Sequence, residues 1–259
     1  MNKNFNALRF SILSFALLML PMLATAQQLP GDLQFGIQAS PTFGSMNTDN
    51  NLINRDGSNL GLKLGLVAEY YFRENYSFHT GLGFHFNAGG TLFYEDRFTK
   101  VDIWRESLDN TLPANALPDS ISGGLAYKYE LQFLEIPVGL TLRTREFGYL
   151  RYFLRPAFHI GVVTRARGSI KNASFISSEE TFDIGPEVNG VNLSWSLGGG
   201  VEYSISTSTA LVAGLAYQAG FADMTRDNGT SLRRDGRNAE EDDSKGKVGS
   251  LVLMIGIMF

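Results

Sequence analysis

The amino-acid sequence predicts an all-β protein, and three observations lead to that prediction. Of the 259 residues, 28 are glycine and 12 % are aromatic, whereas only 19 % are charged. This composition is typical of strands joined by turns. Apolar and polar residues alternate with period two over most of the chain, which places successive side chains on opposite faces of a strand. The alternating segments are also separated, in turn, by long polar stretches and by tight turns.

The N-terminus predicts export from the cytoplasm. A short basic start is followed by an apolar stretch over 10–23 and by an Ala-Thr-Ala tripeptide at 24–26. This order is typical of a secretory signal peptide with its cleavage site. We therefore expect residues 1–26 to be removed and residues 27–259 to form one domain. After the leader, no apolar run approaches the roughly 18 residues that a membrane-spanning helix needs.

Eight segments alternate strongly enough to be predicted as strands. In the clearest, Tyr76, Phe78 and Leu82 share one face, while His79 and Gly83 lie on the other. Each segment is at least as long as the roughly nine to eleven residues of a tilted membrane strand. The predicted strands are 33–45, 60–72, 76–88, 125–142, 149–164, 191–205, 209–221 and 248–259.

The connections between these strands are of two kinds, in strict alternation. Those at 46–59, 89–124, 165–190 and 222–247 are long and polar, and those at 73–75, 143–148 and 206–208 are tight. An even number of strands with short turns at one end and long loops at the other is typical of outer-membrane barrels. We therefore predict an eight-stranded antiparallel up-and-down transmembrane β-barrel, with long extracellular loops and short periplasmic turns, in the bacterial outer membrane.

A soluble periplasmic barrel that binds an apolar ligand is the structural alternative. Its apolar faces would point inward and its polar faces would meet water. The polar faces here are rich in glycine and serine, which suit the confined interior of an eight-stranded barrel. The apolar faces are rich in leucine and end in tyrosine and phenylalanine, as lipid and its aromatic belts favour. These features favour the membrane barrel, with its polar faces inward.

Charged side chains of both signs are predicted to pair inside the lumen. Buried charges need partners, and eight strands leave an interior that side chains just fill. The lumen is therefore expected to be plugged and not to form a diffusion pore. The predicted polar network consists of Lys63, Glu69, His79, Arg151, Arg155 and Glu202.

Two prolines lie inside predicted strands, where each removes a ladder hydrogen bond and indicates a bulge. Near the first, Pro137, the apolar residues change from odd-numbered to even-numbered positions between Phe133 and Ile136. We interpret this change as one extra residue near Leu134. Counted from the following turn, Pro137 is expected to face Pro156 across the hairpin; the alternative is two unrelated strand prolines.

Motifs for catalysis, metal binding or phosphate binding are missing from the sequence. It contains no G-x-S-x-G elbow, Walker loop, H-E-x-x-H motif or EF-hand loop. It has no cysteine and three scattered histidines, which gives poor support for a metal site. No third residue completes a Ser-His-acid set with Ser40 and His85. The net charge of −4 and the lack of a basic patch argue against nucleic acid. We predict no enzyme activity, no catalytic or metal residue and no cofactor.

The last predicted strand alternates up to the aromatic Phe259 at the C-terminus. This ending resembles the recognition strand of bacterial outer-membrane proteins, although an ordinary buried terminal strand would also produce it. We therefore predict that Phe259 is an assembly signal, and that the barrel-assembly machinery is a partner.

Two motifs carry a family resemblance, FLEIP at 133–137 and GGGVEYS at 198–204. The stretch from about 125 to 221 resembles the PorT-type outer-membrane β-barrel proteins of Bacteroidetes, which typically carry an aromatic-Leu-Glu-Ile-Pro strand. These motifs mark scaffold positions, so the resemblance implies a fold and a location and transfers no active site. The family's namesake is linked to a secretion and gliding system, a role that membership does not imply.

These observations predict a non-enzymatic outer-membrane barrel that acts through its long surface loops, in binding or as a component of an envelope or secretion complex. The expected partners are outer-membrane lipid, lipopolysaccharide and an envelope protein of unknown identity. The alternative functions are a lipid-modifying outer-membrane enzyme with a site at the loop-side rim, and the soluble periplasmic ligand-binding barrel.

Overall fold

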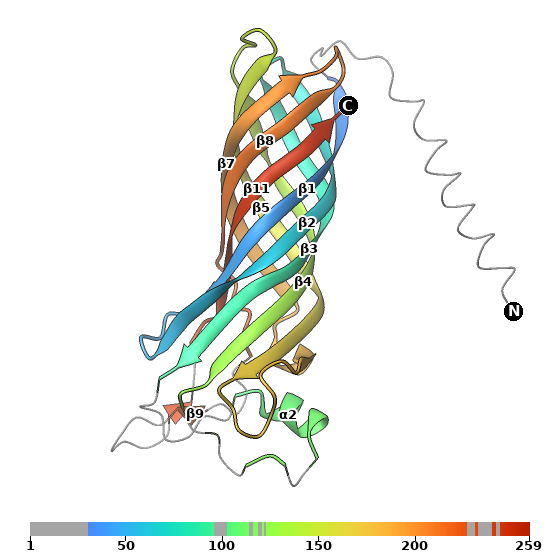
Figure 1. Ribbon diagram of the computed structural model, residues 1–259. Coiled ribbons are helices and arrows are strands. Elements are labelled where there is room, and N and C mark those ends of the chain that lie inside the picture. The colour runs from blue at the N-terminus through green and yellow to red at the C-terminus, as the bar shows by residue number, and fades with distance from the viewer. Residues whose placement is uncertain are drawn as a thin grey trace, which may run out of the picture.

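Eight long strands close into a single ring (Figure 1). The computed structural model describes residues 31–95, 103–113, 116–118, 121, 123–226, 231–232, 240–241 and 244–259. The predicted signal peptide at 1–26 lies outside these residues. The ring strands are β1 (Leu33–Asn47), β2 (Ile53–Arg73), β3 (Tyr76–Tyr94), β4 (Ala126–Arg143), β5 (Leu150–Lys171), β7 (Val191–Ser204), β8 (Ala210–Gly220) and β11 (Lys247–Met258). Each pairs antiparallel with its sequence neighbours, and β11 pairs with β1 to close the ring. The prediction of an all-β antiparallel barrel is confirmed.

The short elements gather at the end of the barrel that carries the long connections. Figure 1 shows α2 and β9 there, opposite the C-terminus. Among the described residues, no helix combines the length and apolar character needed to cross a bilayer. These elements are α2 (Arg105–Thr111), β6 (Phe182–Asp183), the 3₁₀ turn η2 (Gly185–Glu187), β9 (Ser231–Leu232) and β10 (Glu240–Glu241). We call this end the loop end and the other the short-turn end.

Several strands extend further toward the loop end than the sequence predicts. The expected long loop at 46–59 is instead a connection over 48–52, because β2 begins at Ile53. The added part of β2 contains an irregularity between Arg55 and Ser58, and Gly57 has a positive φ of 99°. A bulged, polar strand shows no clean alternation, so periodicity alone missed it.

The apolar faces of the strands point outward. On β2, Leu60 is 67 % exposed and Leu66 is 64 % exposed, whereas the neighbouring Lys63 is 7 % exposed. A closed ring of exposed leucine, phenylalanine and tyrosine is far larger than the apolar patches that a soluble protein shows to water. The soluble barrel is therefore excluded, because it requires these side chains to face inward.

The register of β4 and β5 differs from the sequence prediction at the prolines. Pro137 pairs with His159, and Pro156 pairs with Leu197 on β7. The prediction that the two prolines face each other is wrong. The turn is displaced from the assumed centre, because Arg143 still belongs to β4 and pairs with Phe153.

The prediction of an extra residue near Leu134 is also wrong, because β4 keeps its odd-numbered side chains inward throughout. The irregularities lie in its partners, between His85 and Ala88 on β3 and at Thr164 on β5. The apolar residues of β4 change face because the lumen itself changes character. Phe133 is buried inside the barrel at 0 % exposure, whereas Ile136 faces outward at 43 %.

Candidate functional site

The candidate site is the lumen, which contains two charged clusters and an apolar core. The charged cluster nearer the short-turn end is centred on Glu69, and we call it the Glu69 cluster. The second, which we call the Glu135 cluster, lies beyond it. The loop-end core is the set of buried apolar residues beyond the second cluster, contributed by the strands and by the long connections. It includes Tyr129, Trp104 and Phe182.

The Glu69 cluster joins four strands, β2, β3, β4 and β5, through one carboxylate. Glu69, on β2, is fully buried and accepts hydrogen bonds from Ser77 Oγ at 2.7 Å and from Arg155 Nη2 at 2.8 Å. Arg143 on β4 forms a close ion pair with the same carboxylate. His79 Nδ1 lies 3.3 Å from Glu69 Oε1. Charge-assisted contacts of this number fix the carboxylate in one orientation.

Arg143 links Glu69 to a second carboxylate across the lumen. Its Nε donates to Glu202 Oε2 at 2.7 Å, and its Nη2 donates to Glu202 Oε1 at 2.9 Å. This fork-to-fork pairing is the geometry that a guanidinium and a carboxylate favour. The guanidinium also stacks on Tyr71, with its carbon 4.9 Å from the ring centroid. The result is a crossbar from β2 through β4 to β7.

The Glu135 cluster joins a different set of strands. Lys63 Nζ donates to Glu135 Oε2 at 2.5 Å and also to the side-chain oxygen of Gln218. His85 Nδ1 lies 3.3 Å from Glu135 Oε1. Gln218 Nε2 donates to Ser194 Oγ at 2.7 Å. This second crossbar therefore connects β2, β3, β4, β7 and β8.

The two clusters balance in charge. Three cations and three carboxylates face one another in the described part of the lumen, all of them buried. Buried charges are tolerated when they are paired and hydrogen-bonded. A lumen balanced in this way offers no excess charge to attract an ion. The six groups are Lys63, Arg143, Arg155, Glu69, Glu135 and Glu202.

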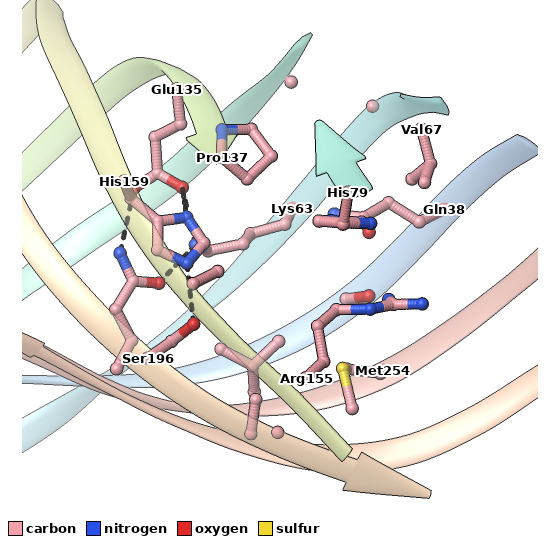
Figure 2. Close-up of a pocket in the computed structure, with 18 of the residues that line it drawn as sticks. Gln38, Lys63, Val67, His79, Glu135, Pro137, Arg155, His159, Ser196 and Met254 are labelled. Carbon is pink, nitrogen blue, oxygen red and sulfur yellow. Dashed lines mark hydrogen bonds and ion pairs between the residues drawn. The ribbon is translucent and has the colours of Figure 1, made fainter. Parts of the chain in front are cut away.

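A small cavity of about 70 Å³ lies between the two clusters (Figure 2). Its polar lining includes Gln38, His79, Arg155, His159 and Gln218. One water needs roughly 10–15 Å³ of such volume and two to four polar partners. The cavity therefore has room for a few waters and is much smaller than the roughly 300 Å³ or more of an ordinary ligand pocket.

The cavity wall also holds a serine and a histidine in hydrogen-bond contact, as Figure 2 shows. His159 Nε2 lies 2.8 Å from Ser196 Oγ, and His159 Nδ1 lies 4.0 Å from Glu135 Oε2. No sequence motif indicates this set, because Ser196, His159 and Glu135 come from three strands, β7, β5 and β4. In a catalytic triad the acid is hydrogen-bonded to the imidazole; here Lys63 holds the nearer carboxylate oxygen instead.

The structure brings together five of the six predicted network residues. Lys63, Glu69, His79, Arg155 and Glu202 lie in the two clusters. Arg151 lies apart, at the mouth of the short-turn end, with its Nη2 3.2 Å from Glu146 Oε2. That mouth contains a cavity of about 590 Å³, whose lining includes Arg151 and the turn between β7 and β8.

Three residues central to the clusters were absent from the predicted network. The sequence predicts that Arg143 lies in the turn at 143–148 and that Glu135 lies beside a bulge near Leu134. Gln218 is uncharged. It points inward from β8, whereas the neighbouring Tyr217 points outward. Strict alternation carried through β4 to residue 143 places Glu135 and Arg143 inward, and the same alternation on β8 places Gln218 inward. The predicted assembly residue Phe259 donates its backbone N–H to Phe35 O at 2.7 Å, beside β1.

The loop-end core is built around Trp104, which precedes α2. Its indole is 2 % exposed and packs edge-on against Tyr129 and Phe182, with ring centroids 4.8 and 5.8 Å apart. The indole N–H donates to the Tyr129 hydroxyl at 3.2 Å. Gly168 lies directly against the ring, where a Cβ would come within 2.5 Å of the indole. Only glycine leaves room for the tryptophan at this point.

A buried carboxyl connects two of the long connections to each other. Glu187, in η2, accepts a hydrogen bond from the Ser107 backbone N–H in the first turn of α2, at 3.1 Å. Burial raises the pKa of the Glu187 carboxyl above its ordinary value, and the hydrogen bonds from Ser107 partly offset that rise. The described residues 103–113 of the connection after β3 and the connection at 172–190 therefore form one folded cap.

These features define a membrane β-barrel with a filled lumen and a folded cap at one end. A family model described as "Outer membrane protein beta-barrel domain" matches residues 25–226. The chain belongs to this family, and the protein is located in the outer membrane. The narrower resemblance to the PorT-type proteins of Bacteroidetes stays a prediction.

The comparison with solved structures finds other outer-membrane barrels. Neisserial surface protein A is 13 % identical over 86 % of this chain and 95 % of its own, with a TM-score of 0.43. The attachment invasion locus protein Ail of Yersinia pestis is 14 % identical over 89 % of this chain and 100 % of its own, with a TM-score of 0.36. The outer-membrane protease OmpT of Escherichia coli is 9 % identical over 92 % and 99 %, with a TM-score of 0.37. No curated protein matches the sequence.

Proposed function

We propose that this protein is a closed, non-enzymatic outer-membrane scaffold that presents a folded cap at the cell surface for binding, on its own or within an envelope complex. The observation that carries the proposal is the apolar core around Trp104, which joins the long connections to the barrel wall. Long connections that serve only to link strands have no need of a shared core. A folded cap offers a surface of fixed shape, which lowers the entropic cost of binding.

The filled lumen supports a binding role over a transport role. The Glu69 and Glu135 clusters cross the barrel at two levels, and every one of their charges is paired. Eight strands enclose a space that side chains fill, whereas aqueous channels of this architecture use 16 to 18 strands.

We place the loop end outside the cell and the short turns in the periplasm, as is general for bacterial outer-membrane barrels. A cysteine introduced at Glu179, an exposed position of the cap, is expected to react with a membrane-impermeant maleimide on intact cells. A cysteine at Ser206, in the β7–β8 turn, should react only after lysis. The reverse pattern would contradict this orientation.

The binding role is tested by cross-linking in outer membranes, with the wild-type chain compared to Trp104→Ala. A partner that uses the cap should cross-link to the wild type and be lost from the variant, while the variant still forms a heat-resistant barrel. The same cross-linked products from both forms would contradict a role for the cap. Phe175, partly buried at the edge of the loop-end core, is a suitable position for a photoreactive side chain.

A second candidate function, a lipid-modifying acyl hydrolase or transferase, is favoured by the contact between Ser196 and His159. A histidine that accepts the serine proton would activate the hydroxyl for attack on an ester. Two observations argue against this candidate. Glu135 lies 4.0 Å from His159, too far for a hydrogen bond that would orient the imidazole. The cavity of about 70 Å³ is too small to admit an acyl chain.

A fluorophosphonate probe distinguishes the two candidates. The scaffold proposal expects no labelling of the refolded protein, and identical results for wild type and Ser196→Ala. Labelling that Ser196→Ala abolishes, while Ser194→Ala keeps it, would support the enzyme. Ser194 is a matched control because it lies on the same inward face of β7 and pairs with His159 in the sheet, but its hydroxyl accepts a hydrogen bond from Gln218.

A further inference from the structure

The outer face of β5 changes from apolar to basic at the end of the lipid-facing surface. Phe158, Ile160 and Val162 point outward and are 49–64 % exposed. Beyond the exposed bulge residue Thr164, the outward positions are the exposed Arg165 and Arg167. The bulge at Thr164 produces this change, because it moves the odd-numbered residues of β5 from the inner face to the outer face.

Both arginines are available to a ligand. Within the described residues, neither side chain makes an ion pair, and the carboxylates beside Arg167 are already engaged. Glu130, its partner on β4, accepts from Lys128 Nζ at 2.5 Å. Asp183, its partner on β6, accepts from the Gly185 backbone N–H at 2.7 Å.

The outer face of β7, the next long strand of the ring, stays apolar beside this row. Val191 and Trp195 point outward and pair with Val162 and Phe158 of β5. Aromatic side chains at this level are typical of any membrane interface. Two neighbouring arginines are not needed to hold a barrel at the membrane interface, so they indicate a specific contact with an anion.

We propose that Arg165 and Arg167 bind the phosphate of a phosphorylated glycolipid, lipopolysaccharide, in the outer leaflet. Guanidinium groups pair with phosphate oxygens through two parallel hydrogen bonds. The apolar row from Phe158 to Val162 lies next to the arginines on the side of the short-turn end, and it would contact the acyl chains of the same molecule. A ligand with acyl chains on one side and a phosphate on the other matches this surface. The assignment to the outer leaflet rests on the orientation in the proposed function.

The test measures lipid binding to the full refolded chain in octyl glucoside, by native mass spectrometry with diphosphoryl lipid A. The variant R165Q/R167Q removes both guanidinium groups. The control R55Q/R73Q removes the same charge from two exposed positions on β2, at the tip of the hairpin with β1 and at the short-turn end. Heat-dependent gel mobility establishes that each form has folded into a barrel.

We expect wild type and R55Q/R73Q to bind lipid A equally within about twofold. R165Q/R167Q should bind lipid A at least about tenfold more weakly, because each of its two substitutions removes a charge-assisted contact. Dephosphorylated lipid A should bind the wild type as weakly as lipid A binds R165Q/R167Q. Equal binding of lipid A by R165Q/R167Q and wild type would overturn the proposal. Equal affinity for phosphatidylglycerol and lipid A would also overturn it, since the site would then recognise phosphate on any lipid.

This experiment is independent of the orientation of the barrel, because both ends are accessible in detergent. Surface labelling of Glu179→Cys decides the orientation separately. A failed lipid test with correct labelling would therefore reject the phosphate site and leave the proposed scaffold intact. Reversed labelling would reject the orientation and, with it, the assignment of the site to the outer leaflet.

Discussion

In the middle of the barrel the lumen is filled by paired charges, whereas at the loop end it is filled by apolar and aromatic side chains. The middle is made by the strands alone, with each charged group contributed by an inward position of β2, β4, β5 or β7. The loop-end core needs the connections as well, since Trp104, Ile121 and Ile176 lie between strands. One lumen thus contains two kinds of interior, stabilised by different forces.

This difference shows why one barrel can contain both a charged interior and an apolar interior. Inside the membrane region the outer surface is apolar, so the polar residues of the alternation necessarily face inward and must satisfy one another. Beyond the membrane the outer surface meets water, and the usual arrangement of a soluble protein returns, with apolar residues inside. The inward face of β4 follows this change, from Glu135 to Phe133 and Leu131.

The largest expected effect is the loss of Glu69 from the middle of the lumen. Glu69→Gln keeps the size of the side chain but leaves Arg155 without a carboxylate, and Arg143 with Glu202 alone. Breaking a buried pair in this way costs roughly 3–5 kcal/mol. Urea unfolding of the refolded barrel in detergent should show this loss.

The control for that change is the double variant Glu69→Gln with Arg155→Gln, which restores the charge balance. It should recover part of the lost stability, with a coupling energy of roughly 0.5–3 kcal/mol. Additive losses would contradict a direct pairing between these two residues.

The next effect concerns the loop end. Trp104→Ala removes the centre of the loop-end core, and a buried tryptophan truncated to alanine costs roughly 3–5 kcal/mol. Because the cap lies outside the paired strands, the loss should appear as local opening. Limited proteolysis should cleave the connection at 172–190 faster, with heat-dependent gel mobility unchanged. Unfolding of the whole barrel at the same denaturant concentration as Glu69→Gln would show that the two regions are one cooperative unit.

The extent to which the sequence predicted each region follows from the same comparison. Period-two alternation identifies the inward charges, and it placed Lys63, Glu69 and Glu202 correctly on the inner face. It failed where a register changes without a sequence signature, as at Thr164 on β5. The loop-end core could not be found in this way, because Trp104 and Phe182 lie in segments with no periodicity. Their contact depends on the closed barrel, which brings distant connections together.

A smaller effect tests which side of the wall faces lipid. Leu64 is 40 % exposed and points outward, next to the inward Lys63. Leu64→Arg should cost roughly 2–4 kcal/mol if the position lies near the bilayer midplane. Lys63→Arg keeps a cation beside Glu135 and serves as the matched control. Equal yields of folded barrel in lipid vesicles from both variants would contradict the assigned faces.

The smallest effect is a pH dependence confined to the cap. The pKa of Glu187 is raised in the folded protein, so the fold favours its protonated form, and stability falls as pH rises from below 4.5 through the raised pKa. Glu187→Gln keeps an oxygen for the Ser107 N–H and removes this penalty. The variant cap should resist proteolysis slightly better than wild type at pH 7, by less than about 1 kcal/mol, with no difference at pH 4. A cap weakened by Glu187→Gln at neutral pH would contradict this account.

The central claim is that the barrel is closed at two independent levels, and single-channel recording in planar bilayers tests it most directly. The refolded wild-type monomer is predicted to give no stable conductance. Trp104→Ala should also remain silent, because the Glu69 and Glu135 clusters still cross the lumen. Stable conductance of porin size from the wild-type monomer would contradict the closed lumen. The same conductance from Trp104→Ala alone would show that the charged clusters do not close the barrel by themselves.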